Sequence, residues 1–218
     1  MSRIVVTGAG TEIGKTYVTC RLIEALRARG RKVAALKPIV SGFDPDDAQA
    51  SDPALMLRAL GREADTASIA EIAPLRFAAP LAASMAARAE GKTLRFDDVL
   101  AICRARDGDP LLIEGAGGVM APVDGTHTFL DLIVALDAPP ILVTGSYLGA
   151  ISHTLTAIAA LKAQGRAPLC AIVNEGVVPG IDLAETIAAM QALAPDILFS
   201  PLAKGGVLED AMVSKIAG

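Results

Sequence analysis

A glycine-rich segment near the start of the chain, from Gly8 to Thr16, constrains the fold and chemistry more than any other feature. It follows an apolar run at residues 4–7 and leads into a helical pattern. Glycines permit positive φ and let a ligand approach the backbone, and free N–H groups at a helix start attract anions. This order predicts a phosphate cradle, with Lys15 reaching the β- and γ-phosphates and the Thr16 hydroxyl holding Mg²⁺.

The spacing of this loop departs by one residue from the common phosphate-loop pattern. Five residues separate Gly8 from Gly14, whereas the common G-x-x-x-x-G-K-[ST] pattern has four. A glycine-rich turn that binds nothing is the alternative. The coincidence of a strand, Gly-Lys-Thr and a helix start favours a loop that binds a nucleoside triphosphate.

Composition limits the classes of function. The 218 residues are 52% hydrophobic, which suits one domain whose sheet is covered on both faces. Aromatic residues make up only 3% and the net charge is −4, so neither a stacking platform nor a basic footprint for nucleic acid is expected. Isolated cysteines at 20, 103 and 170, together with the absence of a leader-like or membrane-length apolar segment, predict a cytoplasmic protein without membrane partners.

Apolar runs of strand length alternate with helical patterns. Strands are expected at 3–7, 32–37, 110–114, 140–144, 168–174 and 197–199, and helices at 15–29, 52–60, 80–90, 96–106, 128–136, 149–164 and 182–193. Runs that are apolar throughout indicate strands covered on both faces. The alternation predicts a single α/β domain over residues 1–218, with a doubly wound, mostly parallel sheet flanked by helices.

Polar residues at strand ends are candidate site residues, because ligands of such sheets bind beyond the carboxyl ends of the strands. Lys37 ends the second expected strand, with Ser41 shortly after it; it either points into the ligand crevice or is a solvated edge lysine. Glu114 ends an apolar strand, the usual place for a Mg²⁺ ligand beside a phosphate loop. Asp52 is either a second metal ligand or a helix-start residue favoured by capping.

Two further strand ends leave their roles open. Asn174 offers a paired donor and acceptor that fits an adenine edge, or is a plain turn residue. The strand-loop-helix junction at 144–153 offers N–H groups to a second anion such as a carboxylate. His153, in the first turn of that helix, suits capping or packing as well as catalysis.

Six segments together resemble the dethiobiotin synthetase family, and the resemblance covers nearly the whole chain. They are TGAGTEIGKT at 7–16, ALKPIVSG at 35–42, SD at 51–52, LLIEGAGGVMAPV at 111–123, LGAISHTL at 148–155, and Asn174. The longer phosphate loop is itself typical of that family. The Lys-Pro-x-x-Ser-Gly and Glu-Gly-Ala-Gly-Gly blocks are more specific than any phosphate loop alone.

The resemblance implies a P-loop NTPase-like fold, ATP as co-substrate and Mg²⁺ as cofactor. It also implies carbon dioxide and 7,8-diaminononanoate as substrates. One amine forms a carbamate, ATP phosphorylates the carbamate, and the second amine closes the cyclic urea to give dethiobiotin, ADP and phosphate. Lys15, Lys37 and Mg²⁺ would neutralise the repulsion between the carbamate and the γ-phosphate.

The resemblance also assigns the site residues to four groups. Catalysis is expected from Lys37, Lys15, Glu12 and Ser41, and Mg²⁺ ligation from Thr16, Asp52 and Glu114. The nucleotide is expected to contact Gly10, Thr11, Glu12, Ile13, Gly14, Lys15, Thr16, Tyr17, Glu114, Asn174, Pro201, Leu202 and Ala203. The diamine is expected at Lys37, Ser41, Gly117, Gly118, Leu148, Gly149 and Ser152.

The family resemblance implies a homodimer in which the helix start near Leu148 binds the carboxylate of the diamine across the interface. This chain carries Ser152 where asparagine is expected, and serine has a shorter reach. A switch ATPase of the partitioning type, which shares the fold, is the alternative function. Such proteins carry a lysine early in the phosphate loop, where this chain has Gly10, and they lack the Lys-Pro-x-x-Ser-Gly block.

Overall fold

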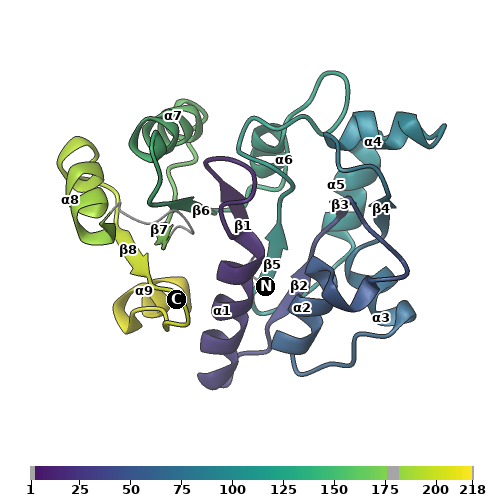
Figure 1. Cartoon of the computed structure of the whole chain (residues 1–218), viewed down its shortest axis with the longest axis horizontal. Helices are drawn as coiled ribbons and strands as arrows, with labels where there is room; N and C mark the ends of the chain where they lie inside the picture. The colour runs from purple at the N-terminus through teal and green to yellow at the C-terminus, as the bar shows by residue number, and fades with distance from the viewer. Residues whose placement is uncertain (1–2, 176–181, 218) are drawn as a thin grey trace.

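A six-stranded parallel sheet runs through the computed structural model, which describes residues 3–175 and 182–217 (Figure 1). Its strands lie in the order β2-β5-β1-β6-β7-β8, and every neighbouring pair is parallel. The strands are β1 (Arg3–Gly8), β2 (Ala34–Leu36), β5 (Leu111–Glu114), β6 (Pro140–Gly145), β7 (Ala171–Asn174) and β8 (Phe199–Leu202). This sheet confirms the predicted doubly wound α/β class.

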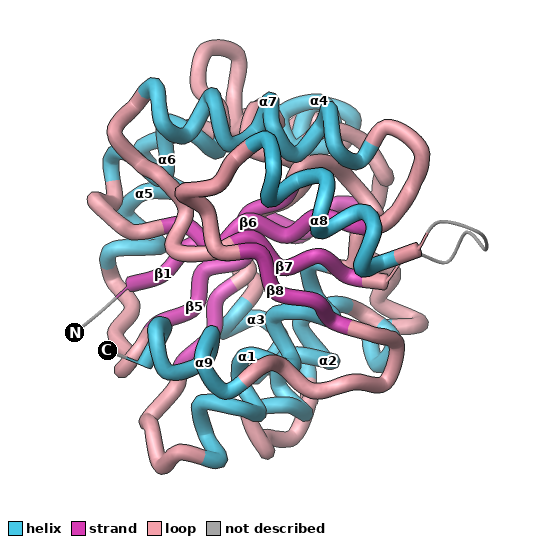
Figure 2. The backbone as a smooth tube through the Cα atoms, turned by 90° about the vertical axis from the view of Figure 1, so that its left-hand side faces the viewer, coloured by secondary structure: helices cyan, strands magenta, loops and turns pink. Residues whose placement is uncertain are grey.

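Helices cover both faces of the sheet, as Figure 2 shows edge-on. They are α1 (Lys15–Ala28), α2 (Asp52–Ala59), α3 (Thr66–Ile72), α4 (Ala83–Ala89), α5 (Phe96–Arg104), α6 (Phe129–Ala135), α7 (Ala150–Ala163), α8 (Leu183–Leu193), α9 (Asp210–Ala217) and the 3-10 helix η1 (Ala48–Ala50). Successive strand residues point to opposite faces. Val5 therefore packs in the core shared with α4 to α8, while Ile4 and Val6 pack in the core shared with α1, α2, α3 and α9.

The register of the central strands gathers the predicted site at one edge of the sheet. Val6 on β1 lies opposite Glu114 at the end of β5, and Gly8 lies opposite Val143 on β6. On the other side, Asn174 at the end of β7 pairs with Leu202 on β8. Because the strands are parallel, their carboxyl ends meet there, which is where such sheets bind ligands.

Several elements differ from the sequence expectations. β3 (Ile39–Ser41) and β4 (Leu75–Phe77) form a separate two-stranded parallel sheet that was not predicted, and α3 and α9 were not predicted either. The second strand ends at Leu36, one residue before Lys37, and α4 begins at Ala83 rather than at Pro80.

The last strand is also displaced from its predicted position. β8 runs past the expected end at Phe199 and includes Pro201, because proline is tolerated where a strand lies at the edge of a sheet. Among residues 3–175 and 182–217, no helix is long and apolar enough to cross a membrane.

Candidate active site

A cleft of about 810 Å³ opens where the phosphate loop meets the ends of β2 and β5. All of the predicted catalytic and metal-binding residues line it, namely Glu12, Lys15, Thr16, Lys37, Ser41, Asp52 and Glu114. Four residues predicted to contact the nucleotide or the diamine line it as well, namely Thr11, Gly14, Tyr17 and Gly117. Residues that are up to 111 positions apart in the chain, from Thr11 to Pro122, therefore share one solvent-accessible space.

The backbone of the phosphate loop requires glycine at two positions. A Cβ on Gly8 would lie 2.7 Å from Cδ1 of Ile13 and 3.0 Å from the Gly10 carbonyl oxygen. Gly14 has a φ of 84°, and a Cβ there would lie 2.2 Å from Nδ2 of Asn174. Gly14 also precedes α1 as its N-cap, without a side-chain cap from the described residues. The first N–H groups of α1 are thus available to an anion.

Lys15 lies folded against its own loop. Its Nζ donates a hydrogen bond to the Gly10 carbonyl at 3.0 Å, and the residue is only 8% exposed. Burial lowers the pKa of Lys15 to about 8, despite the opposing charge of Glu114 and with a further contribution from Lys37. Phosphate oxygens would favour the charged form, so nucleotide binding and protonation of Lys15 should be coupled.

A buried cluster of charges adjoins the loop. Glu114 is completely buried. Its Oε1 accepts a 2.6 Å hydrogen bond from the Thr16 hydroxyl and forms an ion pair with Nζ of Lys37 at 2.5 Å. Lys37 also pairs with Oδ2 of Asp52 at 2.5 Å. Burial alone would lower the pKa of Lys37, but Glu114 and Asp52 outweigh it and hold the pKa above its usual value. The structure buries Lys37, so it is not the solvated edge lysine that was the alternative. Asp52 belongs to this cluster and is also the first residue of α2, so its contact with Lys37 and its place at the helix start coexist.

This cluster is chemically suited to Mg²⁺. Thr16, Asp52 and Glu114 offer one hydroxyl and two carboxylates, and oxygen is the donor that Mg²⁺ prefers. Among the described residues, Oε2 of Glu114 is buried with no hydrogen-bond partner, so it is free to accept a cation. The described residues contain no group of three or more His, Cys, Asp or Glu side chains that could hold a metal by themselves. The remaining ligand positions would therefore fall to nucleotide oxygens and water.

The predicted diamine residues divide between the cleft and other places. Ser41 lines the cleft, and its Oγ is buried without a hydrogen-bond partner in the part of the chain that the structure describes. Gly117 lines it with a φ of 74°. Gly118 lies behind the phosphate loop, where a Cβ would come within 3.2 Å of the Gly8 carbonyl oxygen.

The predicted carboxylate subsite is not part of the cleft lining in the single chain. Leu148, Gly149 and Ser152 stand at the start of α7 and are not among the cleft-lining residues, and Leu148 is 92% exposed. Beside them, the Tyr147 hydroxyl and Nδ1 of His153 are 2.9 Å apart. A Cβ on Gly10 of the phosphate loop would lie 4.0 Å from the Tyr147 hydroxyl, so the start of α7 adjoins the loop without lining the cleft.

The predicted adenine residues border the phosphate loop. Asn174 Nδ2 donates to the Ile13 carbonyl at 3.3 Å, which places the amide against the loop. The turn that follows Pro201, Leu202 and Ala203 is tied to α1, because the N–H of Gly205 donates to the Tyr17 hydroxyl at 3.0 Å. Tyr17 thus links the cleft to the end of β8.

No role was assigned from the sequence to the remaining lining residues, which we call the cleft wall. It consists of Ile39, Pro80, Leu81, Ala82, Ala83, Ala116, Ala121 and Pro122. Residues 80–83 come shortly after the end of β4. Because ligands bind beyond the carboxyl ends of parallel strands, recognition of that three-residue strand in the sequence would have pointed to them.

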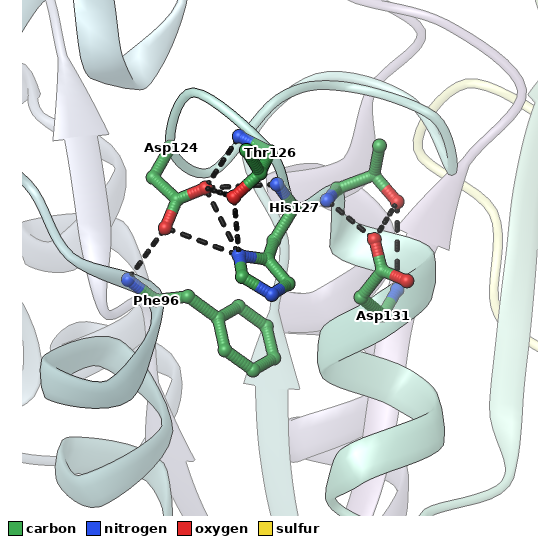
Figure 3. A network of polar contacts seen from close by, with 6 residues as sticks. Phe96, Asp124, Thr126, His127 and Asp131 are labelled. Atoms are coloured by element: carbon green, nitrogen blue, oxygen red, sulfur yellow. Dashed lines mark hydrogen bonds and ion pairs between the residues drawn. The ribbon is translucent and has the colours of Figure 1, made fainter.

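A polar network centred on Asp124 (Figure 3) follows Ala121 and Pro122 of this wall in the chain. The same loop pairs with them, since the Phe129 N–H donates to the Ala121 carbonyl and Pro122 forms a bridge with Thr128. The Asp124 carboxylate accepts hydrogen bonds from the backbone N–H groups of Thr126 at 2.8 Å, His127 at 2.8 Å and Phe96 at 3.0 Å. The His127 ring stacks on Phe96 with a centroid distance of 4.3 Å. The network fastens the loop that carries the wall to the start of α5.

Comparison with known proteins agrees with the fold and the loop. Residues 2–197 match the family described as "AAA domain", so the chain belongs to that class of domain. The hydrogenase maturation factor HypB from Archaeoglobus fulgidus has a TM-score of 0.57 at 16% identity, over 99% of this chain and 88% of that one. At this identity the likeness shows a shared fold.

Closer relatives identify the family. ATP-dependent dethiobiotin synthetase BioD from Caulobacter sp. (strain K31) is 50% identical over 207 residues, which are 93% of this chain and 86% of the relative. The protein of that name from Methylobacterium nodulans is 45% identical over 216 residues, covering 94% and 95% of the two chains. The chain belongs to the dethiobiotin synthetase family.

Proposed function

We propose that this protein is an ATP-dependent dethiobiotin synthetase, a ligase that forms carbon–nitrogen bonds in biotin biosynthesis. The observation that carries the proposal is the convergence of the phosphate loop, Lys15, Lys37 and the acids Asp52 and Glu114 in one cleft. Relatives of that name at 45–50% identity over more than nine-tenths of the chain support it. The substrates are ATP, carbon dioxide and 7,8-diaminononanoate.

The phosphate loop and two lysines bind and orient the triphosphate. The N–H groups at the start of α1 hold the phosphates, with Lys15 at the β- and γ-positions. Thr16, Asp52 and Glu114 would hold Mg²⁺, which would supply positive charge to the phosphate oxygens. The adenine base of ATP would lie between Asn174 and residues 201–203, beside Tyr17.

Lys37 acts where two negative groups approach each other. A carbamate oxygen attacks the γ-phosphorus and ADP leaves; the second amine then attacks the carbamate carbon and phosphate leaves. Lys37 stabilises the charge that gathers in the first of these steps. Glu12, Ser41 and Gly117 line the same cleft and position the diamine.

The carboxylate of the diamine requires a second subsite. We assign it to the start of α7, with Gly149 and Ser152, supplied by the other subunit of a homodimer. The absence of these residues from the cleft lining of a single chain and the exposure of the neighbouring Leu148 support the assignment. The enzyme acts in the cytoplasm.

The decisive experiment measures ADP release with and without the diamine and bicarbonate. The proposal predicts that ADP release requires both and that dethiobiotin accumulates in equal amounts. Lys37→Ala should lose turnover by orders of magnitude while remaining folded, because Lys37 acts on transition-state charge. Lys32→Ala is the matched control, since Lys32 is an exposed lysine before the other end of β2.

Two results would contradict the proposal. Rapid ADP release without the diamine, stimulated instead by DNA or a protein, would favour the switch ATPase. Full turnover by Lys37→Ala would remove this lysine from the mechanism.

A further inference from the structure

The three residues assigned to Mg²⁺ all surround one ammonium group. Nζ of Lys37 lies 2.5 Å from Oδ2 of Asp52 and 2.5 Å from Oε1 of Glu114. It also lies 3.4 Å from the Thr16 hydroxyl oxygen. The hydroxyl and both carboxylates thus meet at a single cation that belongs to the protein itself.

We propose that the Lys37 ammonium occupies the metal position in the metal-free protein, and that Mg²⁺ and this ammonium exchange there. Entry of the metal releases Lys37 into the cleft. The inference rests on the proposed function for its assignment of Thr16, Asp52 and Glu114 as ligands. It adds an order of events: the lysine reaches the phosphate only after the metal has arrived.

Burial explains why the site needs a resident cation. Glu114 is completely buried, and an isolated carboxylate is strongly disfavoured in such surroundings. Lys15, the other buried lysine of the cleft, bonds to the Gly10 carbonyl instead. Lys37 is therefore the group that neutralises Glu114 when no metal is bound.

Both cations cannot keep the same oxygen atoms. Oε1 of Glu114 already accepts bonds from Lys37 and from Thr16. A divalent ion that bound the unpartnered Oε2 of the same carboxylate would still lie close enough to repel an ammonium held on Oε1. The backbone of Lys37 is fixed, because its N–H donates to the Ile72 carbonyl at 2.8 Å. The exchange is thus a movement of the lysine side chain, without displacement of the strand.

The cleft provides a destination for the released ammonium. Lys37 and Ser41 both line it, and the Ser41 Oγ is buried without a hydrogen-bond partner among the described residues. A lysine released toward Ser41 would face the space assigned to the diamine, on which the carbamate forms. Metal loading would thereby prepare the catalytic lysine as well as the nucleotide.

The test measures binding of Mn²⁺, as a probe for Mg²⁺, by electron paramagnetic resonance with no nucleotide present. Lys37→Met removes the resident cation, so we expect Mn²⁺ to bind at least tenfold more tightly than to the wild type. Lys15→Met is the matched control: it removes the same charge from the same cleft without a bond to either acid. We expect it to improve Mn²⁺ binding by a smaller factor.

A second variant keeps the proposal testable if Lys37→Met fails to fold. Lys37→Arg retains the charge and pairs more firmly with carboxylates, so we expect Mn²⁺ binding severalfold weaker than in the wild type. Adding Asp52→Asn to Lys37→Met should abolish the gain.

Three outcomes would overturn the exchange. They are a gain in Lys37→Met no larger than in Lys15→Met, wild-type binding in Lys37→Arg, and a gain that survives Asp52→Asn. Dethiobiotin formation is measured separately on the wild type. Failure of the exchange and failure of the proposed function are therefore distinguishable.

Discussion

Replacing Gly14 with alanine tests whether the phosphate loop is built as the structure shows. Gly14 has a φ of 84°, and a Cβ there would lie 2.2 Å from Nδ2 of Asn174. The substitution therefore causes backbone strain and displaces the Asn174 amide. That amide donates to the Ile13 carbonyl at 3.3 Å, so its displacement also loosens the loop.

The expected magnitude is the sum of two effects. The left-handed backbone conformation costs alanine about 1–2 kcal/mol, and loss of the Asn174 hydrogen bond costs about 1 kcal/mol. Gly14→Ala should therefore lower the free energy of unfolding by about 2–3 kcal/mol. Because the loop also holds the phosphates, ATP should bind at least ~10-fold more weakly, which corresponds to about 1.4 kcal/mol.

Urea unfolding measures the stability change, and titration calorimetry measures ATP affinity. Gly30→Ala is the matched control, since Gly30 has a φ of 77° with nothing within 4 Å of the added Cβ. It should lose only about 1–2 kcal/mol and bind ATP normally. In an Asn174→Ala background the steric part of the Gly14→Ala effect should disappear. Equal effects of Gly14→Ala and Gly30→Ala on both measurements would refute the reasoning.

Three further predictions concern Lys15, Tyr17 and Asp124. Burial lowers the pKa of Lys15 to about 8, so above pH 8 the binding of ATP should be accompanied by uptake of as much as one proton, and the affinity should fall as the pH rises. Calorimetry in buffers of different ionisation enthalpy measures the proton uptake, and an ATP affinity that does not change with pH would contradict the prediction. Tyr17→Phe removes the acceptor of the Gly205 N–H and should raise KM for ATP severalfold with little change in kcat. An unaltered KM would show that the turn at Gly205 does not contribute to nucleotide binding. Burial raises the pKa of Asp124, but hydrogen bonds from backbone N–H groups outweigh burial and hold this pKa well below its usual value. Asp124→Ala should therefore destabilise the protein by about 2–3 kcal/mol at pH 7. This loss should shrink as the pH falls below about 4, because the unfolded chain then binds a proton on this carboxylate that the folded protein does not yet bind. A loss that is the same at pH 7 and pH 3 in urea unfolding would count against the network.

The parts of the fold that the sequence predicted are those with strong local signals. β1, β5 and β6 each contain an unbroken apolar run of three residues, because both faces of these strands are buried. β3 and β4 have three residues each, too few for a period to be visible, and they are held by pairing with each other. α9 was missed although Met212, Val213 and Ile216 mark a buried helix face.

The candidate site was predictable to the same extent. The phosphate loop and the strand-end residues Lys37 and Glu114 follow from motif and topology. Their direct contact does not, because it joins positions 77 residues apart and depends on how β2 and β5 pair. The wall at 80–83 and the support from Asp124 depend on loops, whose course is set by tertiary contacts.

The most direct measurement is a crystal structure with Mg²⁺, a non-hydrolysable ATP analogue and the diamine bound. The account predicts the metal on Thr16, Asp52 and Glu114, with Nζ of Lys15 on the phosphates and Nζ of Lys37 moved from Glu114 toward the γ-phosphate. A structure in which both lysines point away from the bound phosphates would contradict it.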